Sequence, residues 1–460
     1  MPRPSTPEAG PAARTALWRH TPDAYQGIAD TIERDIASGR FVPGGRLPTH
    51  RAMAKRLGVA VATVSRAYAE VRRRGLTDAR AGSGTFVRRA PGGGPGEAPE
   101  AFDLTVSSLD PLRHASEIFQ RLARVAPRDQ ALLRYPPTAG LPAHRETGAQ
   151  WLRGVGLDCP ADRVLLTMGA QHGLAVAFEA LLTPGELVLA ESLTYHGVRA
   201  QAGVLGFRLQ AVAMDDEGLV PDALAAAARA SGARVVYCIP TLQNPTSAVM
   251  SASRREALAV VARACDLTIV EDDVYGPLVP DVPRLASLAP ERTIYVASAA
   301  KSFAAALRIG FLAAPAPLVA RLEQVLAATT LGASPLLAET VHRLIADGVA
   351  GRIVAWKRDE LKARQDVVTR LFAGLELRTH PASQNVWLSL PEGWTADRFV
   401  ARAQLEGVLV SPASSFAVEA PGPEAVRFSV GPPETRAHLE RALTTLRSLL
   451  RNERATRPVI

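Results

Sequence analysis

Short apolar runs alternate with helical segments between residues 102 and 313, and this alternation constrains the fold more than any other feature of the sequence. Each run is four to six residues long and has no polar face. Continuous runs of this kind are typical of strands in a parallel sheet that is covered on both sides. We therefore predict an α/β unit whose large, mostly parallel sheet has strands at 163–167, 186–190, 234–239, 267–271, 293–297 and 310–313.

The rest of the chain divides by composition. At 460 residues, more than one domain is expected. Residues 1–21 have the composition of a flexible leader, and residues 89–101, rich in Pro and Gly, that of a flexible linker. We expect the second domain to cover 102–460. Its end, from about 355 to 460, starts with a charged helix and then alternates strand-like and helical segments, which indicates a smaller α+β lobe.

The basic charge is confined to one end of the chain. Residues 1–90 carry 15 Arg and one Lys against seven acidic residues, whereas the remaining residues carry a net charge of −1. Such an asymmetry predicts a domain that binds a polyanion, joined to a nearly neutral domain.

The basic segment has the pattern of a DNA-binding head. A first helix runs from about residue 25 to the Ser-Gly pair at 38–39. A second begins after Thr49 and ends at Gly58, and a third follows over 61–74. Two strand-like pieces, 76–78 and 85–87, flank a Gly-Ser-Gly turn. Helix, helix-turn-helix and β-wing in this order predict a winged helix.

The last helix of a helix-turn-helix places its N-terminal side chains in the major groove, and basic residues around it contact phosphates. The alternative is a small helical domain with a solvated arginine face. The residues that we expect to contact DNA are Arg46, Thr49, Arg51, Thr63, Ser65, Arg66, Arg72 and Arg73.

Residues 22–88 closely resemble the winged-helix domain of GntR-type bacterial regulators. The matching motifs are Leu-Pro-Thr at 47–49, Leu-Gly-Val at 57–59, Arg-Ala-Tyr at 66–68, Arg-Gly-Leu at 74–76 and Gly-Ser-Gly-Thr-Phe-Val at 82–87. The resemblance implies double-stranded operator DNA as a partner.

Lys301 is the candidate reactive residue of the second domain. The chain has only four lysines, and this one follows an apolar run and stands among small residues. Poor solvation lowers the pKa of an amine and makes it nucleophilic, which suits a Schiff base with an aldehyde cofactor. The alternative is a surface lysine whose stem lies on apolar neighbours.

Polar residues follow four of the predicted strands. Asn244, Asp272, Lys301 and the Gly-Ala-Gln sequence at 169–171 each stand where a strand has just ended. Ligands bind beyond the carboxyl ends of the strands in open α/β sheets, and the amides at a helix N-terminus bind phosphate. We therefore expect these residues to converge on one site.

This set resembles the cofactor site of fold-type I aminotransferases, which bind pyridoxal 5'-phosphate. The resemblance implies a Schiff base at Lys301, a carboxylate partner for the pyridine nitrogen at Asp272, and donors to the phenolic oxygen at Tyr275 and Asn244. It implies a phosphate cradle, a stacking aromatic, an arginine for a substrate carboxylate and a tyrosine that reaches the partner subunit. The cradle residues are Ala170, Gln171, Ser298 and Arg308. The stacking aromatic is Tyr195, the arginine for the carboxylate is Arg427, and the tyrosine that reaches the partner subunit is Tyr135.

Each of these residues also has an ordinary structural explanation. Asp272 could cap a helix, Arg427 could be a sheet or surface arginine, and Tyr195 could be a core tyrosine. His172 and His196 stand near the predicted site but are more often structural in such places. No metal-ligand spacing is found among the cysteines, Cys159, Cys238 and Cys265, which we expect to be reduced and buried.

A winged helix followed by an aminotransferase-like domain resembles the MocR subgroup of GntR-type regulators. The resemblance implies a homodimeric transcription regulator that binds pyridoxal phosphate and senses a small amino compound or the cofactor itself. The alternative is a working aminotransferase that carries a DNA-binding head. Without an apolar signal sequence or spanning segment, a cytoplasmic protein is expected.

Overall fold

In the part of the chain that the computed structural model describes, residues 24–37, 41, 47–74, 76–80, 84–87, 101–125 and 130–455, three helices and a two-stranded sheet form the N-terminal unit, residues 1–100. Thr49 caps the second helix, since its hydroxyl oxygen accepts from the Ala52 amide at 3.2 Å, and Gly58 ends it with φ 66°. Both ends were predicted. The elements are α2 (Ala24–Ala37), α3 (His50–Leu57), α4 (Val61–Arg73), β1 (Thr77–Arg80) and β2 (Gly84–Val87).

An apolar core and an ion-pair cluster hold these helices together. Ile28 and Ile32 of α2 pack against Val64 and Tyr68 of α4 in one buried cluster. At the other end of α4, the Arg74 guanidinium contacts three carboxylates within 3.0 Å; these belong to Asp30, Glu33 and Glu70. The helix-turn-helix is thereby fixed to the first helix.

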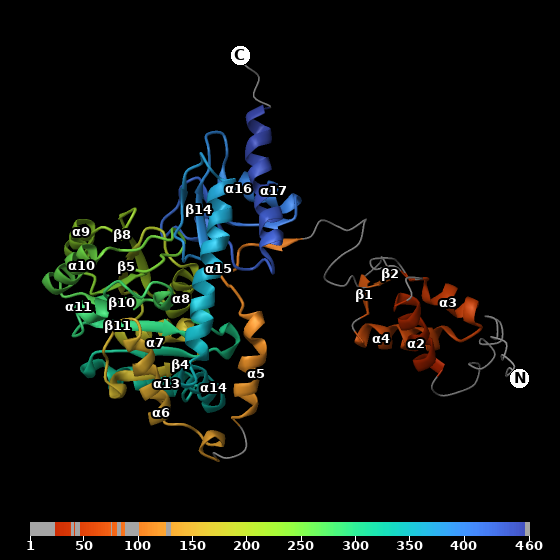
Figure 1. Cartoon of the computed structure of the whole chain (residues 1–460), viewed down its shortest axis with the longest axis horizontal. Helices are drawn as coiled ribbons and strands as arrows, with labels where there is room; N and C mark the ends of the chain where they lie inside the picture. Colours follow the sequence, from red (N-terminus) through yellow and green to blue (C-terminus); the bar gives the residue numbers. More distant parts are fainter. Residues whose placement is uncertain are drawn as a thin grey trace, which may run out of the picture. The chain divides into compact units, whose positions relative to one another are not determined.

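A seven-stranded sheet in the described residues forms the centre of the C-terminal unit, residues 101–460 (Figure 1). All the strands are parallel except β12, which is antiparallel to both its neighbours. The six predicted strands are present, and the edge strand β6 was missed. In spatial order they are β4 (Val164–Thr167), β12 (Gly310–Ala313), β11 (Thr293–Ser298), β10 (Thr268–Asp272), β9 (Val235–Cys238), β5 (Leu187–Glu191) and β6 (Arg208–Val212).

Helices cover both faces of this sheet, and the strand residues alternate between them. In β9, Val235 and Tyr237 pack on one face with α7, α8 and α13, while Val236 and Cys238 pack on the other with α9 and α10. The second face continues over β4 and β12 under α6 and α14. The helices are α6 (Pro142–Arg153), α7 (Ala170–Leu181), α8 (His196–Leu205), α9 (Pro221–Ser231), α10 (Ala252–Ala264), α11 (Leu285–Leu288), α13 (Ala316–Thr329) and α14 (Pro335–Ala346); a short pair, β7 (Met214–Asp215) and β8 (Gly218–Leu219), precedes α9.

The long helix α15 (Val349–Leu371) joins the sheet unit to the small lobe (Figure 1). Its first residues, such as Ile353, pack in the core beside the large sheet, and later ones, such as Leu361 and Val368, in the core of the small lobe. The lobe boundary predicted near residue 355 thus falls inside this helix. The lobe contains β13 (Leu377–Arg378), β14 (Asn385–Ser389), β16 (Ser411–Pro412), β17 (Ala425–Ser429), α16 (Ala396–Leu405) and α17 (Arg436–Ala455).

The start of the C-terminal unit also belongs to the small lobe, which was not predicted. Strand β3 (Phe102–Asp103) pairs in parallel with β15 (Val408–Leu409), and Leu104 and Leu109 lie in the core of the lobe. The chain then continues through α5 (Ala115–Ala123) to α6.

Candidate functional site

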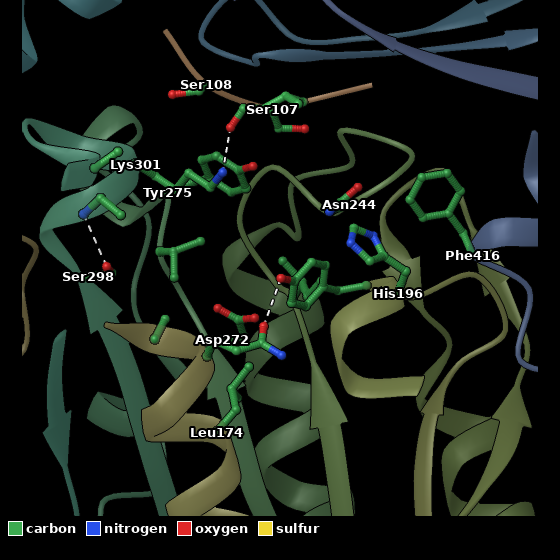
Figure 2. Close-up of a pocket in the computed structure, with 18 of the residues that line it drawn as sticks. Ser107, Ser108, Leu174, His196, Asn244, Asp272, Tyr275, Ser298, Lys301 and Phe416 are labelled. Carbon is green, nitrogen blue, oxygen red and sulfur yellow. Dashed lines mark hydrogen bonds between the residues drawn. The ribbon is translucent and has the colours of Figure 1, made fainter. Parts of the chain in front are cut away.

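A cavity of about 830 Å³ opens at the carboxyl ends of the parallel strands, and Figure 2 shows its lining. Asp272 ends β10, Lys301 lies in the short helix α12 (Ala299–Ser302) after β11, and Ala170 begins α7 after β4. The structure brings together ten of the predicted site residues. They are Ala170, Gln171, Tyr195, Asn244, Asp272, Tyr275, Ser298, Lys301, Arg308 and Arg427.

Lys301 projects from one helical turn that Ser298 caps. The Ser298 hydroxyl accepts from the Ala300 amide at 3.1 Å, which fixes the start of the turn. The Lys301 ammonium donates to the backbone carbonyl of Ser107. Burial, helped by the nearby charge of Arg427, lowers the pKa of Lys301 to about 8. A substantial fraction of this amine is therefore neutral and nucleophilic in weakly alkaline solution.

Asp272 lies at the floor of the cavity (Figure 2) and is 4 % exposed. Its Oδ2 accepts from the Tyr237 hydroxyl at 2.8 Å, whereas Oδ1 has no hydrogen-bond partner in the described part of the chain. Burial raises the pKa of Asp272 to about 6, against the lowering effect of Tyr237. A buried acceptor without a partner is costly, so this oxygen is prepared for a donor from a ligand.

Two donors stand above this carboxylate. Tyr275 is buried, and burial raises its pKa to about 12, so its hydroxyl keeps its proton at neutral pH. The Asn244 carbonyl accepts from the Arg427 guanidinium at 3.3 Å, and no hydrogen bond of the described residues uses its NH₂ group. Both groups can donate to an oxyanion in the cavity.

The Arg308 guanidinium lies close to the start of α7. Gly169 precedes the helix at φ +80°, no side chain caps the first amides, and the first turn has no acidic residue. A Cβ at Gly169 would lie 2.9 Å from the Arg308 guanidinium, so the glycine allows this arginine to approach the helix end. Exposed amides and a guanidinium together suit a phosphate group.

Arg427, in strand β17, is 2 % exposed and is surrounded by neutral oxygens. One of its NH₂ groups donates to the Ser107 hydroxyl at 3.0 Å, and the other to the carbonyl of Thr105 and, at 3.4 Å, to the Ser411 hydroxyl. Among the described residues it forms no ion pair, and its Nε has no acceptor. Burial lowers its pKa to about 10. A buried guanidinium without a counterion is costly, and an anion that entered the cavity would offset this cost.

Tyr195 stands at the N-terminus of α8 and donates to the Gln171 side chain at 2.8 Å. A Cβ at Gly197 would lie 2.3 Å from its ring, so a glycine at this position leaves room for the ring against the start of the helix. The ring lines the cavity. His172 accepts from the Met168 amide and lies outside the lining, whereas His196 lines the cavity beside Phe416.

Several lining residues were not predicted, because they come from segments far from the strand ends. They are Thr105, Ser107 and Ser108 from the segment after β3, and Ser411, Ser415 and Phe416 from the small lobe. Only the run of hydroxyl residues at 105–108 could have drawn attention to the first group. Tyr135 is 88 % exposed and lies outside the cavity, so its predicted contact with a partner subunit stays a prediction.

In the N-terminal unit, the first turn of α4 is accessible. Val61 is 43 % exposed, no side chain caps the helix start, and no acidic residue stands in its first turn. Thr63 is half-buried and Arg66 is exposed, with its guanidinium 4.3 Å from the ring of Tyr25.

The other residues predicted to contact DNA differ in their exposure and in whether their side chains already have a partner. Arg51 and Arg72 are exposed, but Arg73 pairs with Glu70 at 2.7 Å. The Ser65 hydroxyl lies 3.0 Å from a His50 ring nitrogen, and the Thr49 hydroxyl caps α3. Arg46 lies outside the described residues.

No helix in the described ranges is long and apolar enough to cross a membrane. Within the same ranges no three His, Cys, Asp or Glu side chains gather into a possible metal site, and the three cysteines are free thiols.

Known families match both units. Residues 24–87 match the bacterial regulatory proteins of the gntR family, and residues 102–446 match aminotransferase class I and II. The chain is 33% identical over 485 residues to the HTH-type transcriptional regulator TauR of Rhodobacter capsulatus. This alignment covers 90% of this chain and 96% of TauR. It is 28% identical over 434 residues to the uncharacterized HTH-type transcriptional regulator YdeF of Bacillus subtilis, covering 93% and 94%.

Among solved structures, the chain resembles LysN, an α-aminoadipate aminotransferase of Thermus thermophilus. The TM-score is 0.70 at 26% identity, over 77% of this chain and 93% of LysN. That crystal structure is a complex with N-(5'-phosphopyridoxyl)-L-leucine.

Proposed function

Because the chain belongs to the MocR-type transcriptional regulators of the GntR family, in which an aminotransferase class I and II domain follows the DNA-binding domain, we propose that its cavity binds pyridoxal 5'-phosphate at Lys301 and reports a small amino compound, or the cofactor itself, to the DNA-binding unit. The residues of the cavity fit this cofactor. The unpartnered Oδ1 of Asp272 carries the proposal, since a buried carboxylate oxygen in that position suits a protonated pyridine nitrogen.

The remaining contacts fit the other groups of the cofactor. Tyr275 and Asn244 can donate to its phenolic oxygen, Tyr195 offers a ring for stacking, and the start of α7, Ser298 and Arg308 can hold its phosphate. When bound through Lys301 as a Schiff base, pyridoxal phosphate supplies an aldehyde carbon that can exchange one primary amine for another. An amino compound is thus recognised by its amine.

Arg427 adds a second requirement for the effector. A buried guanidinium whose hydrogen bonds all go to neutral oxygens gains a bidentate pairing with an opposite charge when a carboxylate enters. We therefore expect the amino compound to carry a carboxylate group.

The first turn of α4 is the proposed reading surface for operator DNA. Val61, Thr63 and Arg66 can reach base edges from it, while Arg51 and Arg72 can contact phosphates. The wing, β1 and β2, lies next to this helix in the fold of the unit.

A homodimer is proposed as the working form. Large apolar side chains are exposed on α5, on the turn 130–133 and on α14, which pack on one another; Phe119, Leu133 and Leu336 are examples. Exposed apolar patches of this kind mark subunit interfaces. Tyr135 lies next in the chain and would reach the partner subunit from there.

A working aminotransferase is the second candidate. All the contact types for the cofactor are present, and a lysine with a pKa of about 8 could move a proton as well as bind an aldehyde. The two functions differ in what an amino donor does. A regulator changes its affinity for DNA, whereas an enzyme consumes the donor with multiple turnovers and needs no DNA.

Lys301→Ala tests the cofactor site. We expect the purified protein with pyridoxal phosphate to be yellow and the variant to be colourless, because Lys301 is the only lysine among the described residues that line the cavity. The matched control is Lys362→Ala, a lysine exposed on α15 and paired with Asp366. The assignment would be refuted if the variant kept the absorbance band and borohydride reduction attached the cofactor irreversibly to another residue.

Arg427→Ala tests the effector site. The variant should keep the colour but lose the response to amino acids, because the carboxylate has no partner. Electrophoretic mobility shifts with and without a panel of amino acids measure this. A normal response to a carboxylate-bearing effector would make Arg427 structural.

A further inference from the structure

The segment 105–108 already occupies both cationic groups of the cavity. The Thr105 carbonyl accepts from Arg427, and the Ser107 carbonyl accepts from the Lys301 ammonium. The Ser107 hydroxyl accepts from Arg427 at 3.0 Å and donates to the Asn385 side chain at 2.5 Å. Figure 2 shows Ser107 and Ser108 on the opposite side of the cavity from Asp272 and Leu174.

These contacts are weaker than those that a ligand would make. The acceptors of the segment are neutral, whereas a carboxylate carries the opposite charge and can pair with a guanidinium through two parallel hydrogen bonds. Lys301 and Arg427 are both desolvated, which lowers the pKa of each. A carboxylate is therefore a better partner for Arg427 than the Thr105 carbonyl. The two acceptors compete for the same NH₂ group of Arg427.

The segment is held at both ends by the small lobe. Upstream, the Phe102 amide donates to the Gly407 carbonyl at 2.8 Å and the Leu104 amide to the Leu409 carbonyl at 3.0 Å. Downstream, Leu109 is buried in the core of the lobe. Between these anchors the segment is held by hydrogen bonds of its polar groups, and its one apolar side chain, Val106, is 51 % exposed. It can change its path without unfolding the lobe.

The same segment lies next to the connection with the DNA-binding unit. Thr105 is the fourth residue after Ala101, where the C-terminal unit begins. Four residues span roughly 14 Å at most. The direct covalent route from the segment to the connection therefore runs through β3.

We propose that segment 105–108 is an internal ligand of the cavity, and that an effector carboxylate displaces it from Arg427 and so changes the path by which the chain leaves toward the DNA-binding unit. This rests on the proposed function, because it requires that the cavity binds the cofactor and an amino compound. The segment acts as the competitor that sets how tightly an effector must bind before DNA affinity changes.

The first test follows the segment itself in the full chain. A nitroxide spin label is placed at Val106→Cys in a Cys265→Ser background, since Cys159 and Cys238 are buried. The matched control carries the label at Val260→Cys, on the exposed side of α10 and 62 % exposed. The probes are N-(5'-phosphopyridoxyl)-glycine and N-(5'-phosphopyridoxyl)-methylamine, which differ only in the carboxylate, and calorimetry establishes their binding.

We expect the glycine conjugate to narrow the spectrum of the label at 106, the methylamine conjugate to narrow it less, and the label at 260 to remain unchanged. A bound glycine conjugate that leaves the spectrum at 106 unchanged refutes the inference while the proposed function stands. If neither conjugate binds, the proposed function fails and the inference falls with it.

The second test follows the connection. A Gly-Ser-Gly-Ser insertion between Ala101 and Phe102 is compared with the same insertion after Gly374, in the exposed turn before β13. Allosteric coupling is typically about 5–150-fold in affinity. We expect the glycine conjugate to change operator affinity within this range in the control, and by a factor near 1 in the insertion at 101, although both bind the conjugate equally. Undiminished coupling in the insertion at 101 would show that the signal takes another route.

Discussion

Asp272 illustrates how a binding site is built at the expense of stability. Its pKa is raised from the usual 3.8 to about 6, so the folded protein favours the protonated form and loses stability as the pH rises through 6. A shift of this size corresponds to about 2–3 kcal/mol above pH 7. In the cofactor-free protein, Asp272→Asn should therefore raise the free energy of unfolding.

This gain should be small below about pH 4, where Asp272 is protonated in both the folded and the unfolded state, and reach its full size above pH 7, because the asparagine does not ionise. Urea denaturation at several pH values measures the gain, and the cofactor affinity of the variant should fall at the same time. If the difference in stability between the variant and the wild-type protein did not change with pH, Asp272 would not be buried as a carboxylate. Asp366→Asn, an exposed carboxylate on α15, is the control.

Most residues of the candidate site could be predicted because they follow strand ends, where residue order determines position. Ten of them line one cavity. Ser107, Ser411 and Phe416 could not be predicted, because no local pattern says that β3 pairs with β15 or that the small lobe folds over the strand ends. Their position depends on long-range pairing alone. Whether Tyr135 reaches a partner subunit depends on a second chain.

At the scale of elements, helix α4 carries one exposed arginine and one arginine that is paired with a carboxylate, so the two can be compared in DNA binding. Arg72 is exposed, whereas Arg73 is paired with Glu70. If α4 lies on DNA, Arg72→Ala should weaken binding for all sequences and reduce the slope of log K against log salt by about 1. Arg73→Ala should have a smaller effect, since its charge is already partly neutralised. Fluorescence anisotropy over a salt series measures both slopes.

Arg66→Ala should act differently from either. From the first half of α4 its side chain can reach a base edge, and losing such a contact typically costs about 1–3 kcal/mol of discrimination. Competition between operator and random DNA measures this discrimination. Equal loss for both DNAs would make Arg66 a phosphate contact, and an unchanged affinity would assign it to the packing against Tyr25.

Strands were easier to predict than their surroundings. Each of the six predicted strands is buried on both faces and therefore has a continuous apolar sequence. The missed strand, β6, lies at the edge of the sheet and begins with the exposed Arg208, so its sequence lacks this pattern. The lobe boundary was placed inside α15 because a helix that packs in two cores shows no break in its periodicity.

At the scale of the whole molecule, the predicted architecture of a GntR-type winged helix and an aminotransferase-like unit is confirmed by the fold and by both family matches. The basic charge lies in the first unit, so residues 102–460 alone should not shift operator DNA at any salt concentration that permits binding by the full chain. The full chain should sediment as a dimer and protect two half-sites in a footprint. A shift by 102–460, or a single half-site, would contradict this division of tasks.

The antiparallel strand β12 also has a consequence for synthesis of the chain. The edge strand β4 is among the first parts of the sheet to leave the ribosome, yet its neighbour in the sheet, β12, begins only at Gly310. Until β12 has been made, the apolar residues 164–166 of β4 have no neighbouring strand to pair with. Strands β5, β9 and β10 can pair with one another before β4 joins the sheet. Such long-range pairing slows folding and exposes apolar segments to aggregation. Nascent chains that end before Gly310 should therefore depend on chaperones, whereas the N-terminal unit, whose contacts are local, can fold as soon as it has been translated.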